Sequence, residues 1–174
     1  MRNVILGVAV SLDGYIEGPN GEYDWCFTDQ DYGMTAFLAR IDALVMGRKT
    51  YELLTNPDEV ASNYSFDAYK KYVFSNTLAE VAAGAELLRG DVRTQMDALK
   101  NQPGSDIWLF GGADLTASFL REGLVDEVQL AIHPIILGAG KPLFTNIQDR
   151  INLTLVDSKT YSTGLVSLFY KLTN

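Results

Sequence analysis

The sequence is poor in the residues that form disulfides and transition-metal sites. Its 174 residues include one cysteine, Cys26, and one histidine, His133. A lone cysteine excludes an internal disulfide, and a transition-metal site usually needs several cysteine or histidine ligands. We therefore expect neither feature. We expect His133, which lies in an apolar strand, to have a structural rather than a catalytic role.

The chain also lacks long apolar runs and an excess of positive charge. The apolar stretch that begins at Val4 is short and reaches Asp13 without a small-residue cleavage site. Such a stretch is typical of neither a signal peptide nor a membrane span. The formal net charge is -8, and an acidic surface repels phosphate backbones. We expect a cytoplasmic protein that binds no nucleic acid and no membrane, and that holds any bound phosphate with local groups.

Apolar segments of strand and helix type alternate along most of the chain. Short β-branched runs that end at turn residues predict strands, and longer runs with one apolar face predict helices. The predicted strands are 4–11, 43–46, 71–74, 85–88, 107–110, 127–137, 153–160 and 165–172, and the predicted helices are 29–40, 49–54, 93–101 and 114–122. This alternation predicts one α/β domain over 1–174, with a mostly parallel central sheet, helices on both faces and an antiparallel C-terminal hairpin.

A glycine ends the strand predicted over 43–46, at the start of a helix. Gly47 lets the backbone approach a ligand closely, and Arg48, Lys49 and Thr50 follow in the first helical turn. Cations are unfavourable at a helix N-terminus, whose free N–H groups and dipole favour anions. The segment therefore indicates a bound phosphate. An exposed turn with solvated charges is the alternative that these residues leave open.

A second junction of this kind follows the strand predicted over 107–110, where Gly111 and Gly112 precede a helix. Two glycines permit close approach of the backbone to a diphosphate, although the spacing is not the GxGxxG of ordinary dinucleotide-binding folds. A tight turn with positive φ would explain the glycines without a ligand. Two such junctions in one small domain favour phosphate binding.

Five segments, in this order and spacing, resemble the dihydrofolate reductase superfamily over nearly the whole chain: VAVSLDGYIEG, DALVMGRKTYE, KYVFSNTL, IWLFGGADLTASFL and VDEVQLAIHPIILGAGKPLF. Within it, the chain is similar to the reductase domain found C-terminal in bifunctional riboflavin-biosynthesis deaminase-reductases, and to stand-alone relatives of that domain. The resemblance implies a dihydrofolate reductase-like three-layer fold and an NADPH-dependent reductase of a small heterocyclic substrate. Such stand-alone relatives are often dimers, and the apolar strands in 151–172 could form the contact, so we expect a homodimer.

The resemblance also implies cofactor contacts at matching positions. The implied residues are Ala9 and Ile16 at the nicotinamide, Gly47, Arg48, Lys49 and Thr50 at the phosphates, Ser75 and Asn76 at the adenosine end, and Gly111, Gly112, Ala113, Asp114 and Leu115 at the diphosphate. Arg48 would lie near the 2′-phosphate, and the loop over 13–25 would close over the nicotinamide. The peptide bond between Gly111 and Gly112 is implied to be cis.

Asp31 is the candidate catalytic acid. It lies sixteen positions before Gly47, the spacing that the pterin-binding carboxylate has in the dihydrofolate reductases that the chain resembles. A carboxylate in a partly apolar cleft can pair with the amidine edge of a pterin-like ring and support its protonation. The alternative is that Asp31 only stabilises a helix N-terminus, for which Asp29 is an equally good candidate.

Two departures from the folate reductases affect the expected substrate. Ala131 occupies the place of the strand threonine that accompanies the carboxylate, and Cys26 occupies the place of the loop tryptophan, with Trp25 beside it. These changes weaken the case for dihydrofolate itself. The stretch HPIILGAGKPLF is more similar to the riboflavin-type reductases, and this resemblance implies a ribosylated pyrimidine such as 5-amino-6-(5-phosphoribosylamino)uracil, with a pterin-like ring as the other possible substrate. The two departures also leave open an NADP-binding protein of this fold without catalytic turnover.

Overall fold

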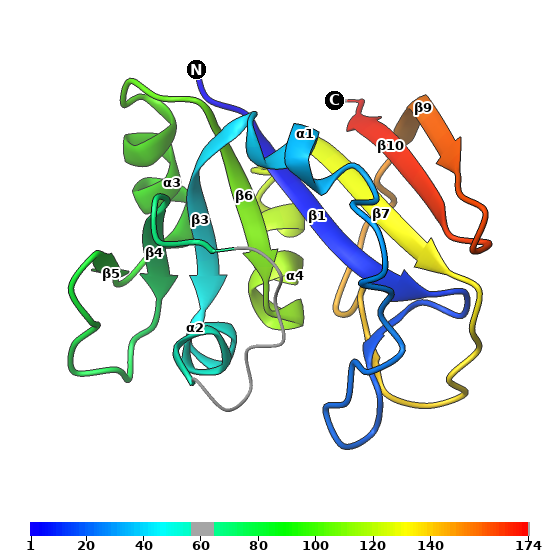
Figure 1. Ribbon diagram of the computed structural model, residues 1–174. Coiled ribbons are helices and arrows are strands. Elements are labelled where there is room, and N and C mark those ends of the chain that lie inside the picture. The colour runs from blue at the N-terminus through cyan, green and yellow to red at the C-terminus, as the bar shows by residue number, and fades with distance from the viewer. Residues whose placement is uncertain (57–64, 174) are drawn as a thin grey trace.

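The computed structural model describes residues 1–56 and 65–173. In this part of the chain the main sheet has eight strands in the order β5-β4-β3-β6-β1-β7-β10-β9 (Figure 1). These strands are β1 (Val4–Ser11), β3 (Ile41–Gly47), β4 (Lys70–Phe74), β5 (Ala85–Leu88), β6 (Asp106–Gly111), β7 (Glu127–His133), β9 (Leu153–Thr160) and β10 (Val166–Leu172). The strands from β5 to β7 in this order are parallel, and β10 is antiparallel to β7 and β9. The predicted sheet and C-terminal hairpin are confirmed.

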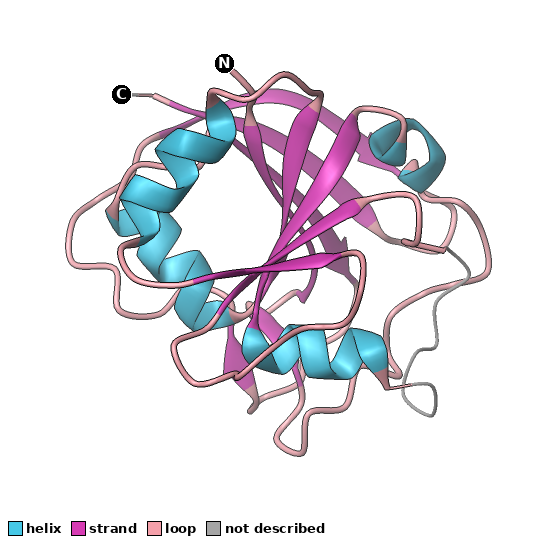
Figure 2. Cartoon of the chain, turned by 90° about the vertical axis from the view of Figure 1, so that its left-hand side faces the viewer, coloured by secondary structure: helices cyan, strands magenta, loops and turns pink. Residues whose placement is uncertain are grey.

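Helices cover both faces of this sheet, as the view along it shows (Figure 2). The helices are α1 (Met34–Leu38), α2 (Arg48–Thr55), α3 (Val92–Lys100) and α4 (Ala113–Arg121). Side chains alternate between the faces of a strand, so Leu6 of β1 packs with Phe119 of α4 while Ile5 packs with Phe37 of α1. The three-layer arrangement is therefore the predicted one. None of the helices in the described residues is long and apolar enough to cross a membrane.

The first helix is much shorter than the one predicted over 29–40. It begins only at Met34, because Tyr32 and Gly33 have φ values of 50° and 85°, which a right-handed helix does not allow. The Tyr32 hydroxyl bonds to Asp29 Oδ1 at 2.6 Å and to Thr163 Oγ1 at 3.1 Å. This tie to the β9–β10 turn holds the segment in a non-helical conformation, so the helix prediction is wrong at its N-terminal end.

Two further differences concern the ends of the strands near the long loop. The strand predicted over 127–137 stops at His133, because Pro134 has no N–H to continue the ladder. The loop over 13–25, which the resemblance places over the nicotinamide, contains the short strand β2 (Tyr15–Glu17), which pairs with β8 (Lys141–Pro142). This second sheet joins segments that are distant in the sequence, so local patterns did not predict it.

The main sheet opens between β1 and β6. Among the described residues, β6 pairs with β1 only from Val4 to Leu6, whereas β7 pairs with β1 as far as Ser11. Beyond Leu6, the indole Nε1 of Trp108 donates to the carbonyl oxygen of Gly7 at 2.8 Å. The C-terminal half of β1 therefore presents one edge to a gap, which is where a parallel α/β sheet usually binds its ligand.

Candidate functional site

The two glycine junctions lie side by side at the ends of neighbouring strands. Met46 of β3 is paired with Gly111 of β6. A Cβ added at Gly112 would lie 3.5 Å from Thr50 Oγ1 and 3.9 Å from Leu115 Cβ, and one added at Gly47 would lie 3.9 Å from the same Leu115 atom. The fold therefore brings together residues that are more than sixty positions apart and that the sequence assigns to phosphate binding.

The helices that start at these junctions have open N-termini. Neither Gly47, before α2, nor Gly112, before α4, provides a side-chain cap, whereas Asp91 caps α3 by accepting from the Thr94 N–H at 2.8 Å. The first N–H groups of an α-helix have no partner inside the helix. Two uncapped helix starts at adjacent strand ends can hold a diphosphate through backbone donors.

The peptide bond between Gly111 and Gly112 is trans, so the expectation of a cis bond is wrong. The chain turns instead through positive φ values of 141° at Gly111 and 96° at Gly112. Only glycine adopts such values at little cost. The glycine pair is therefore explained by backbone conformation.

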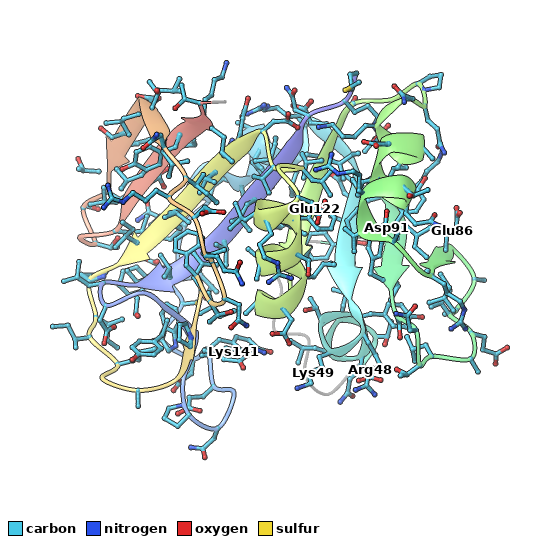
Figure 3. All side chains as sticks on the ribbon, turned by 180° about the vertical axis from the view of Figure 1, so that it is seen from behind. Arg48, Lys49, Glu86, Asp91, Glu122 and Lys141 are labelled. Carbon is cyan, nitrogen blue, oxygen red and sulfur yellow. The ribbon has the colours of Figure 1, made fainter. Side chains whose placement is uncertain are left out.

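Positive side chains gather at this edge of an acidic protein. Arg48 and Lys49 are exposed in the first turn of α2, and Figure 3 shows both, with Lys141, along the lower edge of the molecule where β3 and β6 end. Arg48 is 3.7 Å from Glu52 and both side chains are about half exposed. An exposed pair at that distance is weak, so the guanidinium can turn toward an anion.

Ser75 and Asn76 follow β4, beside the end of β3. The Ser75 hydroxyl accepts hydrogen bonds from the N–H groups of Thr77 and Leu78 at 3.2 and 3.0 Å. Asn76 Oδ1 accepts from the Gly90 N–H at 3.1 Å. Both side chains thus shape the β4–β5 turn, and their contact with a ligand stays a prediction.

Ala9 and Ile16, the residues assigned to the nicotinamide, lie on β1 and β2 on either side of a tight turn. Asp13 fixes this turn, since it accepts from the Ser11 hydroxyl at 2.7 Å and from the N–H groups of Leu137 and Gly138 at 3.1 and 2.8 Å. The Ser11 hydrogen bond is the largest of the effects that lower the pKa of Asp13. Sequence reasoning missed this link because its partners lie more than a hundred residues away.

A cleft of about 450 Å³ lies beside the C-terminal half of β1, on the sheet face that carries α1 and α2. Ala9, Ala131 and Ser167 form its floor and are direct cross-strand neighbours on β1, β7 and β10. Aromatic and aliphatic side chains dominate its walls, among them Phe37 and Trp108. Thr50 also lines the cleft, so the cleft and the glycine junctions meet.

Asp31 lines this cleft, three residues before α1. Its carboxylate accepts from the N–H groups of Gly33 and Thr35 at 3.1 and 2.9 Å, and from the Thr35 hydroxyl at 2.6 Å. The side chain therefore supports the start of the helix and also lines the cleft. Both roles that the sequence left open are compatible with this placement.

His133 is 3% exposed and holds the loop before α1 against β7. The Phe27 N–H donates to Nε2 at 3.1 Å, and Nδ1 lies 3.0 Å from the carbonyl oxygen of Ala131. These partners fit a neutral ring with its proton on Nδ1. Burial lowers the pKa of His133, and the hydrogen bond to Ala131 opposes that shift. The structure thus gives His133 a structural use.

Cys26 also lines the cleft but is not activated. Burial, and then the negative charge of Asp24, raise the pKa of its thiol to about 11. Because the thiolate is the nucleophile, Cys26 provides shape rather than reactivity at neutral pH.

The fold is that of a dihydrofolate reductase-like protein. The dihydrofolate reductase of Enterococcus faecalis, solved with NADP(H), matches 99% of this chain and 97% of its own with a TM-score of 0.71, at 15% identity. Residues 2–167 match the model of the RibD C-terminal domain family, and the chain belongs to that family. It is 45% identical to the uncharacterized protein YyaP of Bacillus subtilis, over 97% of this chain and 94% of that protein. A protein of Shewanella sp. PV-4 that is assigned by name to riboflavin biosynthesis matches with a TM-score of 0.85 and 30% identity, over 100% of both chains.

Proposed function

We propose that the protein is an NADPH-dependent oxidoreductase that reduces a small heterocycle of the pterin-like or ribosylated-pyrimidine type. The observation that carries the proposal is the junction of two sites: Thr50 belongs both to the paired helix starts and to the apolar cleft. A ligand that spans the two would have an anionic part at the helices and a planar part over Ala9. A reduced dinucleotide has this form, and the family and the Shewanella relative support the assignment.

The residues fit such a cofactor. The backbone N–H groups of Gly112 to Leu115 and of the first turn of α2 would hold its phosphates, with Arg48 and Lys49 at the 2′-phosphate and Ser75 and Asn76 at the adenosine end. Backbone groups of Ala9 and Ile16 would meet the nicotinamide. When bound, NADPH supplies a hydride to the substrate.

The cleft residues would prepare the substrate for this reduction. The apolar walls exclude water from the reacting atoms, and Asp31 would orient a ring through its N–H edge and support uptake of the proton. The floor residues Ala9, Ala131 and Ser167 have small side chains, so a flat ring can lie on them. The substrate would therefore bind between the nicotinamide site and α1.

The test is steady-state oxidation of NADPH with a panel of pterins and ribosylated pyrimidines, beside direct titration with NADPH and NADH. We expect NADPH to bind more tightly than NADH and to be oxidised in the presence of at least one panel member. Equal affinity for the two cofactors would contradict the assignment of Arg48 and Lys49.

The second candidate function is an NADP-binding protein without turnover. It is favoured by the hydrogen bonds that Asp31 already makes to Gly33 and Thr35 and by Ala131 in the floor. This protein would bind NADPH with the same preference and oxidise it with no member of the panel.

A further inference from the structure

The charge of the cleft lining restricts what can bind there. The described lining consists of apolar and aromatic residues, neutral hydroxyl and amide side chains, buried His133 and the carboxylate of Asp31, and it contains no lysine or arginine. Within the described lining, a ligand in the cleft therefore meets one negative side chain, that of Asp31, in a protein of net charge -8.

The floor of the cleft is formed by small side chains on three neighbouring strands. Ala9, Ala131 and Ser167 form one cross-strand row, and Gln129 belongs to the adjacent row beside Gly7. A Cβ at Gly7 would lie 2.9 Å from Trp108 Nε1 and 3.1 Å from Phe37 Cζ, so a side chain there would collide with the wall. The space suits a planar ring, and the amide of Gln129 can donate to it and accept from it.

Among the described residues, cations lie near the cleft but not in its lining. Arg48 and Lys49 lie at the edge assigned to the cofactor. The Lys159 ammonium lies 4.9 Å from the centre of the Tyr161 ring, which packs on Tyr32 at the rim with ring centres 5.0 Å apart. Neutral His133 adds no charge. A buried phosphate needs paired cations or several charge-assisted hydrogen bonds, and the cleft lining offers it a carboxylate instead.

We propose that the cleft takes an uncharged planar heterocycle without a phosphate group and discriminates against the phosphoribosylated pyrimidine of the riboflavin-type reductases that the chain resembles. This inference rests on the proposed function, because that function makes the cleft the substrate site. The specificity arises from the neutral floor and from Asp31, whose charge repels a phosphate and attracts the N–H edge of a ring.

The test compares 5-amino-6-(5-phosphoribosylamino)uracil with its dephosphorylated ribosylamino form, and a pterin with its phosphorylated derivative. Binding is followed by intrinsic fluorescence, because both tryptophans of the chain report on this region: Trp108 lines the cleft, and Trp25 packs edge-on against His133 with ring centres 5.3 Å apart. We expect the uncharged form of a pair to bind at least about tenfold more tightly than the phosphorylated form. Salt should narrow the gap by screening the repulsion.

Two variants sharpen the comparison. Gln30, a neutral residue beside Asp31, lines the cleft. Gln30→Arg places a guanidinium there and should raise the affinity for the phosphorylated form while changing that for the uncharged form little. Lys159→Ala removes the cation at the rim and should leave the preference unchanged. Thermal unfolding of each variant verifies that it is folded, and the comparison of the two forms on the unmodified protein does not depend on either variant.

Several outcomes would overturn the proposal. They are equal or tighter binding of the phosphorylated form, loss of its binding in Lys159→Ala, and failure of every pair to bind below millimolar concentration. Failure of the proposed function gives a different result, since the uncharged ligand would then quench the fluorescence in the presence of NADPH without any oxidation of NADPH.

Discussion

At the scale of single residues, Gly112 has a backbone conformation that favours glycine. Its φ of 96° disfavours any side chain, and an added Cβ would lie beside Thr50, 3.5 Å from its Oγ1 atom, where the two helix starts meet. We expect Gly112→Ala to weaken NADPH binding at least about tenfold although no charge is removed, and to lower the free energy of unfolding by about 1 kcal/mol. Fluorescence titration and urea unfolding measure the two effects.

The matched control for this change is Gly123→Ala, at the other end of α4. Gly123 also has a positive φ, 59°, but an added Cβ there would meet no atom within 4 Å. It should show a similar loss of stability with unchanged NADPH affinity. If the two variants bound NADPH equally well, the diphosphate site would not be at Gly112.

Arg48 carries the second residue-scale prediction, which concerns cofactor choice. Charge-assisted bonds to a phosphate are stronger than neutral ones, and the pairing of Arg48 with Glu52 at 3.7 Å is too weak to compete. We expect Arg48→Ala to lower the affinity for NADPH about tenfold and that for NADH much less. Titration with both cofactors measures the gap. The control is Arg93→Ala, which removes an exposed arginine that pairs with Glu122 at the C-terminal end of α4. It should leave the difference between the NADPH and NADH affinities unchanged.

Asp31 can be tested without removing its support of α1. Asn keeps an acceptor for the N–H of Thr35 but loses the charge, so Asp31→Asn should cost less than about 1 kcal/mol in stability. We expect turnover to fall at least about a hundredfold, because the charge orients the ring and supports proton uptake, while NADPH affinity stays nearly unchanged. Asp91→Asn, the equivalent change at the cap of α3, serves as control. Full activity of Asp31→Asn would leave Asp31 with the structural role alone.

His133 gives a prediction about pH. Burial holds its pKa below the ordinary value of 6.5 in the folded protein. The unfolded chain therefore takes up the proton at higher pH, and the free energy of unfolding falls as the pH drops below 6.5. Since the chain has one histidine, His133→Gln should flatten this decline between about pH 7.5 and 5.5. Urea unfolding at several pH values measures it, and an identical decline in both proteins would contradict the assignment.

At the scale of elements, the sequence predicted what local patterns determine. β1, β5 and β9 have the predicted bounds. A buried run rich in β-branched residues marks β1, and the turn of the C-terminal hairpin marks the end of β9. The start of α1 was wrong, because the conformation of Tyr32 and Gly33 depends on contacts with the β9–β10 turn. The pairing of β2 with β8 was missed for the same reason.

The same distinction between local patterns and distant contacts applies to the candidate site. The junctions at Gly47 and Gly112 carry a local signal, a glycine between a buried strand and a helix, and could be read from the sequence. The cleft could not, because its floor comes from β1, β7 and β10, which meet only in the folded sheet. Gln129 and Ser167 therefore have no sequence signal that marks them as lining residues.

At the scale of the whole molecule, the distribution of charge fits the negatively charged cofactor and the uncharged substrate that we propose. The net charge of -8 is opposed locally by Arg48 and Lys49 at the helix starts, while the cleft adds the carboxylate of Asp31. Longer-range repulsion slows the approach of any anion, so only the edge with local cations can hold one firmly. This separation links the cofactor preference to the substrate preference.

The remaining whole-molecule question is assembly. β9 is the last strand of the sheet in the described part of the chain, and all eight of its residues are exposed. Leu155 and Val156 are 52% and 57% exposed. An open strand edge with apolar side chains tends to pair with another chain unless it is covered. We therefore propose a homodimer in which β9 contributes to the contact.

Light scattering at micromolar concentration tests this assembly, and we expect a mass of twice 19.2 kDa. A charge in the contact should be repelled by its symmetry-related copy and lose apolar burial, so Leu155→Glu should shift the protein to monomer. Ile136→Glu is the control, because Ile136 is also an exposed apolar residue, at 70%, but lies in the loop between β7 and β8. It should leave the mass unchanged. A monomeric unmodified protein would refute the dimer, and a dimer that survives Leu155→Glu would place the contact on a surface other than β9.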